Sequence, residues 1–174
     1  MKFIEIGANL TDPIFRGIYR GRRVHEDDFS HMLQRTVKAG VEKIIVTAGC
    51  VKECNEALEL TKNHDNFFST VGCHPTRCSE FEEDPGGPDK YYQKLVDIVT
   101  SESAKDKVVA IGECGLDYDR FKFCPKEIQL KYFERQFQLS ELTGLPMFLH
   151  NRNTGTDFID ILFVNFSKNT LKKK

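Results

Sequence analysis

The chain has 174 residues, of which 40% are hydrophobic and 29% charged, and its formal net charge is −1. This length suits one domain or part of a larger one, and the near-neutral charge excludes nucleic-acid binding driven by overall charge, leaving only a local basic patch. No apolar run approaches the ~20 residues of a membrane span, and the N-terminus lacks the apolar core of a signal peptide. We therefore expect a protein of the nucleus or cytoplasm without a membrane partner.

Apolar strands alternate with amphipathic segments along the chain. Strands are predicted, in chain order, at residues 2–8, 42–49, 66–75, 107–113 and 145–150. Helices are predicted between them, at about residues 26–39, 51–64, 90–102 and 125–143. Repeated strand–helix units with short connections predict a parallel sheet that is covered on both faces.

Two architectures fit five such units: an open doubly wound sheet, or a (β/α)8 barrel cut short, since a whole barrel needs about 250 residues. The segment after the first strand, "GANLTDP", is not the glycine-rich fingerprint of a dinucleotide site. Four strands instead end in residues that can coordinate or hydrogen-bond, namely Asn9, His74, Glu113 and His150. The sequence therefore favours an α/β fold, a partial TIM barrel of about five of eight units, with its ligands at the carboxyl ends of the strands.

The strongest single candidate for chemistry is Glu113, in "VVAIGECGLDYD". A carboxylate at the mouth of a dry core either raises its pKa or finds a cation, and a divalent metal would supply that cation. Capping of turn amides is the alternative. His150 ends the next strand, so it should lie beside Glu113 as a second metal ligand or as a structural histidine. Asp117 can orient a ligand or water, or form an Asx turn.

A phosphate could be held by two further groups. His74 and Arg77 lie on the loop stiffened by Pro75, where they can give charge-assisted hydrogen bonds, although His74 can equally anchor the loop. The first loop carries interleaved aromatic residues and four arginines, Arg16, Arg20, Arg22 and Arg23. Such a loop suits a phosphate backbone with stacked bases, or it is simply solvated charge.

Six cysteines complete the list of reactive residues: Cys50, Cys54, Cys73, Cys78, Cys114 and Cys124. They form no C-x-x-C pair, so we expect reduced thiols that pack in the core rather than a zinc site.

Together these motifs resemble the TatD family of metal-dependent deoxyribonucleases, in its eukaryotic branch, over residues 1 to about 160. The stretches that carry the resemblance are "GANLTDPIFRGIYRG", "STVGCHPTRC", "VVAIGECGLDYDR" and "PMFLHNR". The resemblance implies a TIM barrel of the amidohydrolase type, a divalent cation (Mg²⁺, Mn²⁺ or Zn²⁺), and hydrolysis of phosphodiester bonds with DNA as the substrate.

Position by position, the resemblance implies that Glu113 and His150 bind metal and that His74 lies near the substrate phosphate. Glu113, Asp117 and His74 form the expected catalytic set. Arg77 and the four arginines of the first loop are expected to bind substrate.

This sequence also departs from the family pattern. Gly7 and Asn9 replace the H-x-H pair of many relatives, Asn151 replaces a cysteine and Glu5 an aspartate. A second histidine and an aspartate from later strands are absent. We therefore expect residues 1–160 to form the N-terminal part of a barrel, residues 161–174 a divergent tail, and the nuclease activity to be impaired by truncation. Another metal-dependent phosphoesterase or hydrolase, or a non-enzymatic partial-barrel fragment, are the alternatives.

Overall fold

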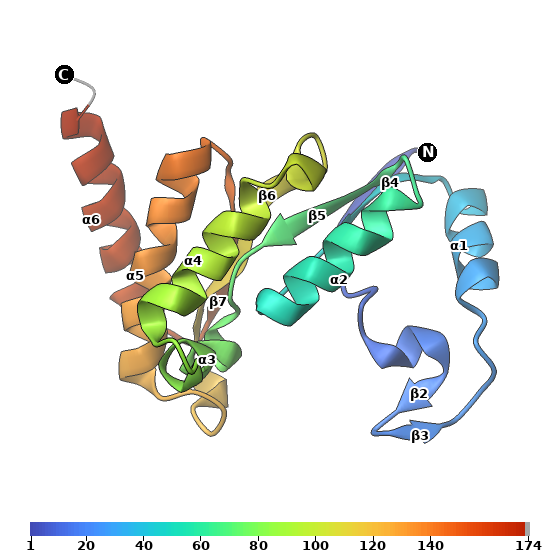
Figure 1. The fold of residues 1–174 in the computed structure, drawn as a ribbon, viewed down its shortest axis with the longest axis horizontal. Coiled ribbons are helices and arrows are strands. Elements are labelled where there is room, and N and C mark those ends of the chain that lie inside the picture. The colour runs from blue at the N-terminus through green and yellow to red at the C-terminus, as the bar shows by residue number, and fades with distance from the viewer. Residues whose placement is uncertain (173–174) are drawn as a thin grey trace.

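The computed structural model describes the backbone of residues 1–172. A curled, five-stranded parallel sheet forms the centre of the molecule (Figure 1). Its strands, in spatial order, are β1 (Phe3–Ala8), β4 (Val41–Val46), β5 (Phe67–Val71), β6 (Val108–Asp117) and β7 (Met147–Arg152). Every neighbouring pair is parallel. The sheet is a half-barrel, as predicted, and among the described residues β1 and β7 each pair on one side only.

Four helices lie close to the predicted places: α1 (Phe29–Lys38), α2 (Val51–Lys62), α4 (Pro88–Val99) and α5 (Lys126–Thr143). Two further helices, α3 (Ser79–Glu83) and α6 (Asp157–Lys172), were not predicted. A small hairpin of β2 (Ile18–Tyr19) and β3 (Arg22–Arg23) interrupts the first connection. Helix α6 extends over most of the segment predicted as a divergent tail, and the divergence of that segment stays a prediction. No helix among the described residues is long and apolar enough to cross a membrane.

Several boundaries differ from the prediction, and for two of them the reason is identifiable. Helix α1 begins at Phe29 rather than near residue 26, because the Asp27 carboxylate accepts the Phe29 amide and so ends the preceding loop there. Strand β6 continues past Glu113 to Asp117, because β7 stays in register beside it and pairs Asp117 with Arg152. This longer strand matters because it carries two carboxylates on one face.

The core divides into two clusters that hold this sheet. The larger cluster packs β4, β5 and β6 against α2 and α4, and the smaller one joins β6 to α5 and α6. In the smaller cluster Phe133 stacks on Phe158 with ring centroids 5.3 Å apart, which ties α6 to α5. All six cysteines are buried and unbonded to one another, as predicted for packing thiols.

Candidate metal centre

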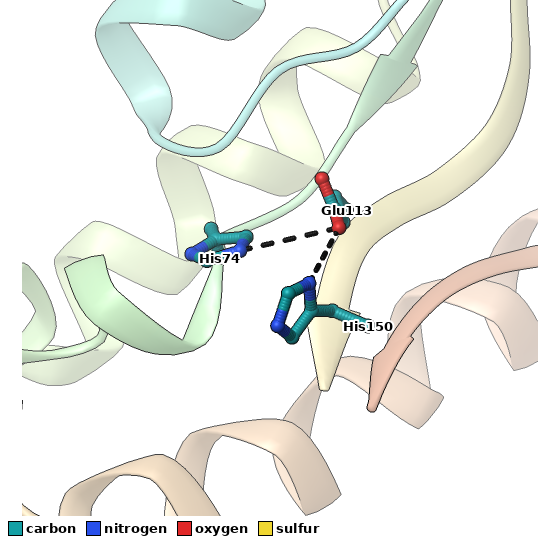
Figure 2. A group of neighbouring side chains, drawn as sticks. All are labelled: His74, Glu113 and His150. Atoms are coloured by element: carbon teal, nitrogen blue, oxygen red, sulfur yellow. Dashed lines mark hydrogen bonds and ion pairs between the residues drawn. The ribbon is translucent and has the colours of Figure 1, made fainter. Parts of the chain in front are cut away.

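The neighbouring parallel strands β6 and β7 bring Glu113 and His150 into contact, as predicted (Figure 2). The Glu113 Oε1 and His150 Nδ1 atoms are 2.9 Å apart. Both side chains are partly buried, with exposed fractions of 23% and 15%. The pair therefore lies at the mouth of the core, where a carboxylate and an imidazole can reach one ion together.

The register of the two strands explains this meeting. Gly115 lies opposite His150, and Glu113 and Asp117 flank Gly115 on the same face of β6 because side chains alternate along a strand. A Cβ atom on Gly115 would lie 2.0 Å from the His150 carbonyl oxygen, and the φ of Gly115 is +144°. Only glycine fits this close approach of the two backbones.

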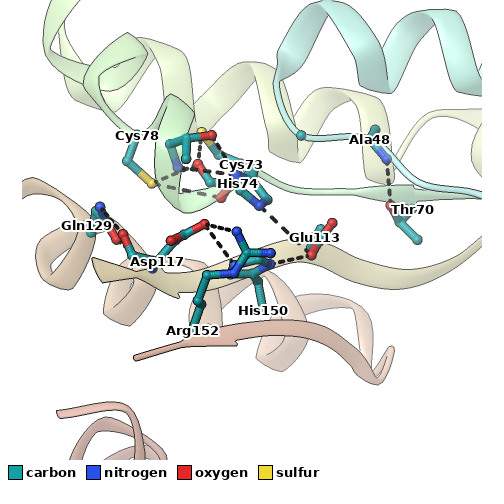
Figure 3. A network of polar contacts seen from close by, with 12 residues as sticks. Ala48, Thr70, Cys73, His74, Cys78, Glu113, Asp117, Gln129, His150 and Arg152 are labelled. Atoms are coloured by element: carbon teal, nitrogen blue, oxygen red, sulfur yellow. Dashed lines mark hydrogen bonds and ion pairs between the residues drawn. The ribbon is translucent and has the colours of Figure 1, made fainter. Parts of the chain in front are cut away.

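Asp117 holds the second nitrogen of the same imidazole (Figure 3). Its Oδ2 atom is 3.1 Å from His150 Nε2, and its side chain is only 2% exposed. Its Oδ1 atom accepts a hydrogen bond from the Asp119 amide at 3.2 Å. Asp117 therefore both orients the His150 ring and forms a turn, the two roles that the sequence allowed. Gln129 fixes the Asp117 backbone by accepting its amide at 2.8 Å and donating to its carbonyl at 3.1 Å.

The roles of the two His150 ring nitrogens depend on where the ring carries its protons. Both ring nitrogens face carboxylate oxygens, which only accept when ionised, whereas a neutral imidazole has one N–H. The hydrogen bond from His150 is the main reason why the pKa of Glu113 is lowered; burial opposes this shift, and the charge of Arg152 acts in the same direction as the hydrogen bond. If Nε2 donates to Asp117, the Nδ1 lone pair and ionised Glu113 are a donor set that divalent cations accept.

His74 completes the cluster in a different role. Its Nε2 atom is 3.9 Å from Glu113 Oε1, and one ligand atom each of His74, Glu113 and His150 lies within 4.8 Å of the others. The backbone amide of Thr76 donates to His74 Nδ1 at 3.2 Å, so a neutral ring carries its proton on Nε2. Since burial lowers the pKa of His74 to about 4, the ring is neutral and directs an N–H, not a lone pair, toward the centre.

A pH dependence of stability follows from buried His74. The pKa of a histidine in an unfolded chain is near 6.5, so between about pH 6.5 and 4 the unfolded state binds the extra proton. The free energy of unfolding is expected to fall as the pH drops through this range, with Glu113 adding its own loss only below about 4.5. Urea denaturation at several pH values should show this slope, and it should be shallower in His74→Gln.

The control for this experiment is the same change at an exposed histidine, His31→Gln on α1. This control should keep the wild-type slope. Identical slopes for wild type and His74→Gln above pH 4.5 would contradict a neutral, buried His74.

A cavity of about 440 Å³ opens beside Glu113 and His74, and its wall includes Asn9 and Arg77. Arg77 is already occupied there, because its Nε donates to Glu80 at 2.7 Å and its NH1 group lies 3.4 Å from Glu53. Its predicted role as a phosphate ligand stays a prediction.

The arginines of the first loop divide into two pairs. Arg16 packs over the Phe29 ring at 3.7 Å, and Arg23 donates to backbone carbonyls at 3.3 and 3.4 Å, so these two hold the loop itself. Arg20 and Arg22 lie on the hairpin, which projects away from the sheet (Figure 1). Among the described residues, none of the four lines the cavity beside Glu113.

Arg152, for which the sequence predicted no role, lies at the candidate metal centre. Its NH1 group lies 3.6 Å from Asp117 Oδ2, next to His150 (Figure 3). The available signal was its position two residues after His150, which puts both side chains on one face of β7.

A parallel half-barrel with a carboxylate–imidazole centre at its strand ends is the framework of a TIM-barrel hydrolase that uses a divalent metal. The chain belongs to the TatD family: the profile of the family described as TatD related DNase matches residues 11–171.

Named relatives agree with this assignment. The chain is 44% identical over 162 residues to "Deoxyribonuclease Tat-D" of Schizosaccharomyces pombe, covering 93% of this chain and 52% of that protein. It is 30% identical to "3'-5' ssDNA/RNA exonuclease TatD" of Citrobacter rodentium, covering 91% of this chain and 52% of the relative. The crystal structure of a TatD family hydrolase from Entamoeba histolytica superimposes with a TM-score of 0.84 at 36% identity, covering 95% of this chain and 55% of that one. The chain therefore spans about half the length of these relatives.

Proposed function

We propose that the centre holds a divalent cation between Glu113 and His150 and serves the hydrolysis of phosphodiester bonds in DNA. The observation that carries this proposal is the 2.9 Å contact between Glu113 Oε1 and His150 Nδ1, with a buried carboxylate behind the imidazole. The names of the relatives, "Deoxyribonuclease Tat-D" and "3'-5' ssDNA/RNA exonuclease TatD", support DNA as the substrate.

When bound, a divalent cation polarises a phosphoryl oxygen and lowers the pKa of a coordinated water. The residues of this chain would do the rest. Asp117 keeps the His150 proton on Nε2, which leaves Nδ1 free to ligate, and the neutral His74 donates its Nε2–H to a phosphate oxygen. The second carboxylate oxygen of Glu113 points away from both histidines (Figure 2), where it can hold a proton of the attacking water.

Magnesium, manganese and zinc all accept one carboxylate and one imidazole, so the metal is to be chosen by experiment. Catalytic sites commonly have three protein ligands, whereas the described residues offer two side chains with lone pairs directed at the centre. We therefore expect these 174 residues to cleave DNA slowly at best.

The test uses purified chain from which metal has been removed, with each of the three cations added back, on plasmid and single-stranded DNA. We expect slow cleavage that depends on added metal and disappears in Glu113→Ala. Bis(4-nitrophenyl) phosphate, assayed in parallel, tests a small-molecule phosphoesterase. Cleavage that survives both chelation and Glu113→Ala would contradict the proposed centre, and fast metal-dependent cleavage would show that two ligands suffice.

A further inference from the structure

Two arginines flank the metal centre and are about equally exposed, at 44% for Arg77 and 45% for Arg152. Their partners differ. Arg77 is held by carboxylates from two helices, Glu53 on α2 and Glu80 on α3, and its NH2 group also contacts the Cys50 sulfur at 3.4 Å. A guanidinium between two carboxylates has its charge neutralised and its fork of donors engaged, so an incoming phosphate gains little from it.

Arg152 is not held between two carboxylates in this way. Its one ion pair among the described residues is the 3.6 Å contact with Asp117 Oδ2, which is longer than a good hydrogen bond. That oxygen is also the acceptor for His150 Nε2 at 3.1 Å, so it is shared between two donors. A guanidinium has five N–H donors, and most of those of Arg152 remain available to a ligand.

The position of Arg152 suits an anion at the centre. Figure 3 shows its guanidinium beside the His150 ring and facing the Asp117 carboxylate. The 3.6 Å contact with buried Asp117 restrains the Arg152 side chain and leaves most of its N–H donors unpaired. Because the side chain is already restrained, it loses less conformational entropy when it forms a bidentate contact with a phosphate.

The charge of the centre leads to the same conclusion. With His150 counted as a neutral metal ligand, Glu113 and Asp117 against Arg152 leave one excess negative charge, which repels a phosphodiester. A divalent cation turns this into one excess positive charge, which matches the single charge of a phosphodiester. Without Arg152 the loaded centre would be neutral, and the attraction would be lost.

We propose that Arg152 is a substrate-binding residue that contacts a backbone phosphate of single-stranded nucleic acid at this centre, and that Arg77 is a structural residue of the loop. This inference rests on the proposed function, because the phosphate is drawn there by the loaded centre.

The experiment measures binding of a fluorescein-labelled oligothymidylate by anisotropy, with manganese present, over a series of salt concentrations. Arg152→Gln is expected to weaken binding about tenfold and to flatten the plot of log K against log salt by about 0.7, the value for one single-strand phosphate contact. Arg77→Gln removes the same charge and should leave the salt slope at the wild-type value. Arg152→Lys should keep the slope with weaker binding, because it keeps the charge and loses the fork.

Calorimetric titration with manganese separates this role from a structural one. If Arg152 acts on the phosphate, Arg152→Gln should bind manganese as tightly as wild type or more tightly, since a repelling charge is removed. A fall in manganese affinity that parallels the fall in oligonucleotide affinity would overturn the inference, as would a wild-type salt slope in Arg152→Gln or a flattened slope in Arg77→Gln. The proposed function is tested separately, because it fails if the wild-type chain binds no manganese. The role of Arg152 is tested by the salt slopes, which come from the oligonucleotide titrations alone.

Discussion

Replacing Glu113 with glutamine is expected to weaken divalent-cation binding by about a hundredfold or more. Loss of one partner behind a metal ligand typically weakens a site 10–100-fold, and loss of a direct ligand should do more. The amide keeps the size of the side chain but removes the charge that is 2.9 Å from His150 Nδ1. Calorimetric titration of metal-free protein with manganese, magnesium and zinc measures the change.

The matched control is Glu102→Gln, at a carboxylate that is 93% exposed on the short helix before β6. It removes the same charge from the chain and should leave the metal affinity unchanged. Equal affinities of Glu113→Gln and wild type would show that the cation, if bound, lies elsewhere.

Gly115→Ala is expected to have the largest effect on stability, with a loss of about 2–4 kcal/mol in the free energy of unfolding. A strained backbone conformation accounts for about 1–3 kcal/mol, and the remainder comes from separating β6 from β7. The added Cβ would lie 2.0 Å from the His150 carbonyl oxygen, so His150 must move away from Glu113 and Asp117. Urea denaturation should report the stability loss, and the same protein should bind manganese more weakly than wild type.

Gly155→Ala is the control that isolates the clash. Gly155 also has a positive φ, +59°, but a Cβ there would meet nothing within 4 Å. This variant should lose only the ~1–2 kcal/mol of a left-handed conformation and keep its metal affinity. Equal losses in the two variants would mean that the close approach of β6 and β7 is not what requires glycine at Gly115.

Local sequence patterns predicted the parallel sheet and the Glu113–His150 pair at its centre. Alternating apolar and amphipathic segments encode strands and helices through local periodicity, and short connections require neighbouring parallel strands. Because Glu113 and His150 lie on successive strands that are neighbours in a parallel sheet, the topology brings them side by side. The buried cysteines were predictable for a similar reason, since no spacing among them suits a metal or a disulfide framework.

The contacts around that pair depend on packing between segments that are distant in the sequence. The extension of β6 to Asp117 depends on pairing with β7, and it makes Asp117 the partner of His150 as well as a turn residue, the two roles that the sequence left open. Arg77 was predicted as a phosphate ligand from its loop, yet its carboxylate partners come from α2 and α3, and such contacts between distant segments leave no local pattern. Arg152 shows the opposite arrangement, because most of its N–H donors remain available to a ligand. This can be recognised only when the positions of the neighbouring carboxylates are known. Local sequence encodes which element forms, whereas the charge and hydrogen bonding of a side chain depend on segments that only packing brings together.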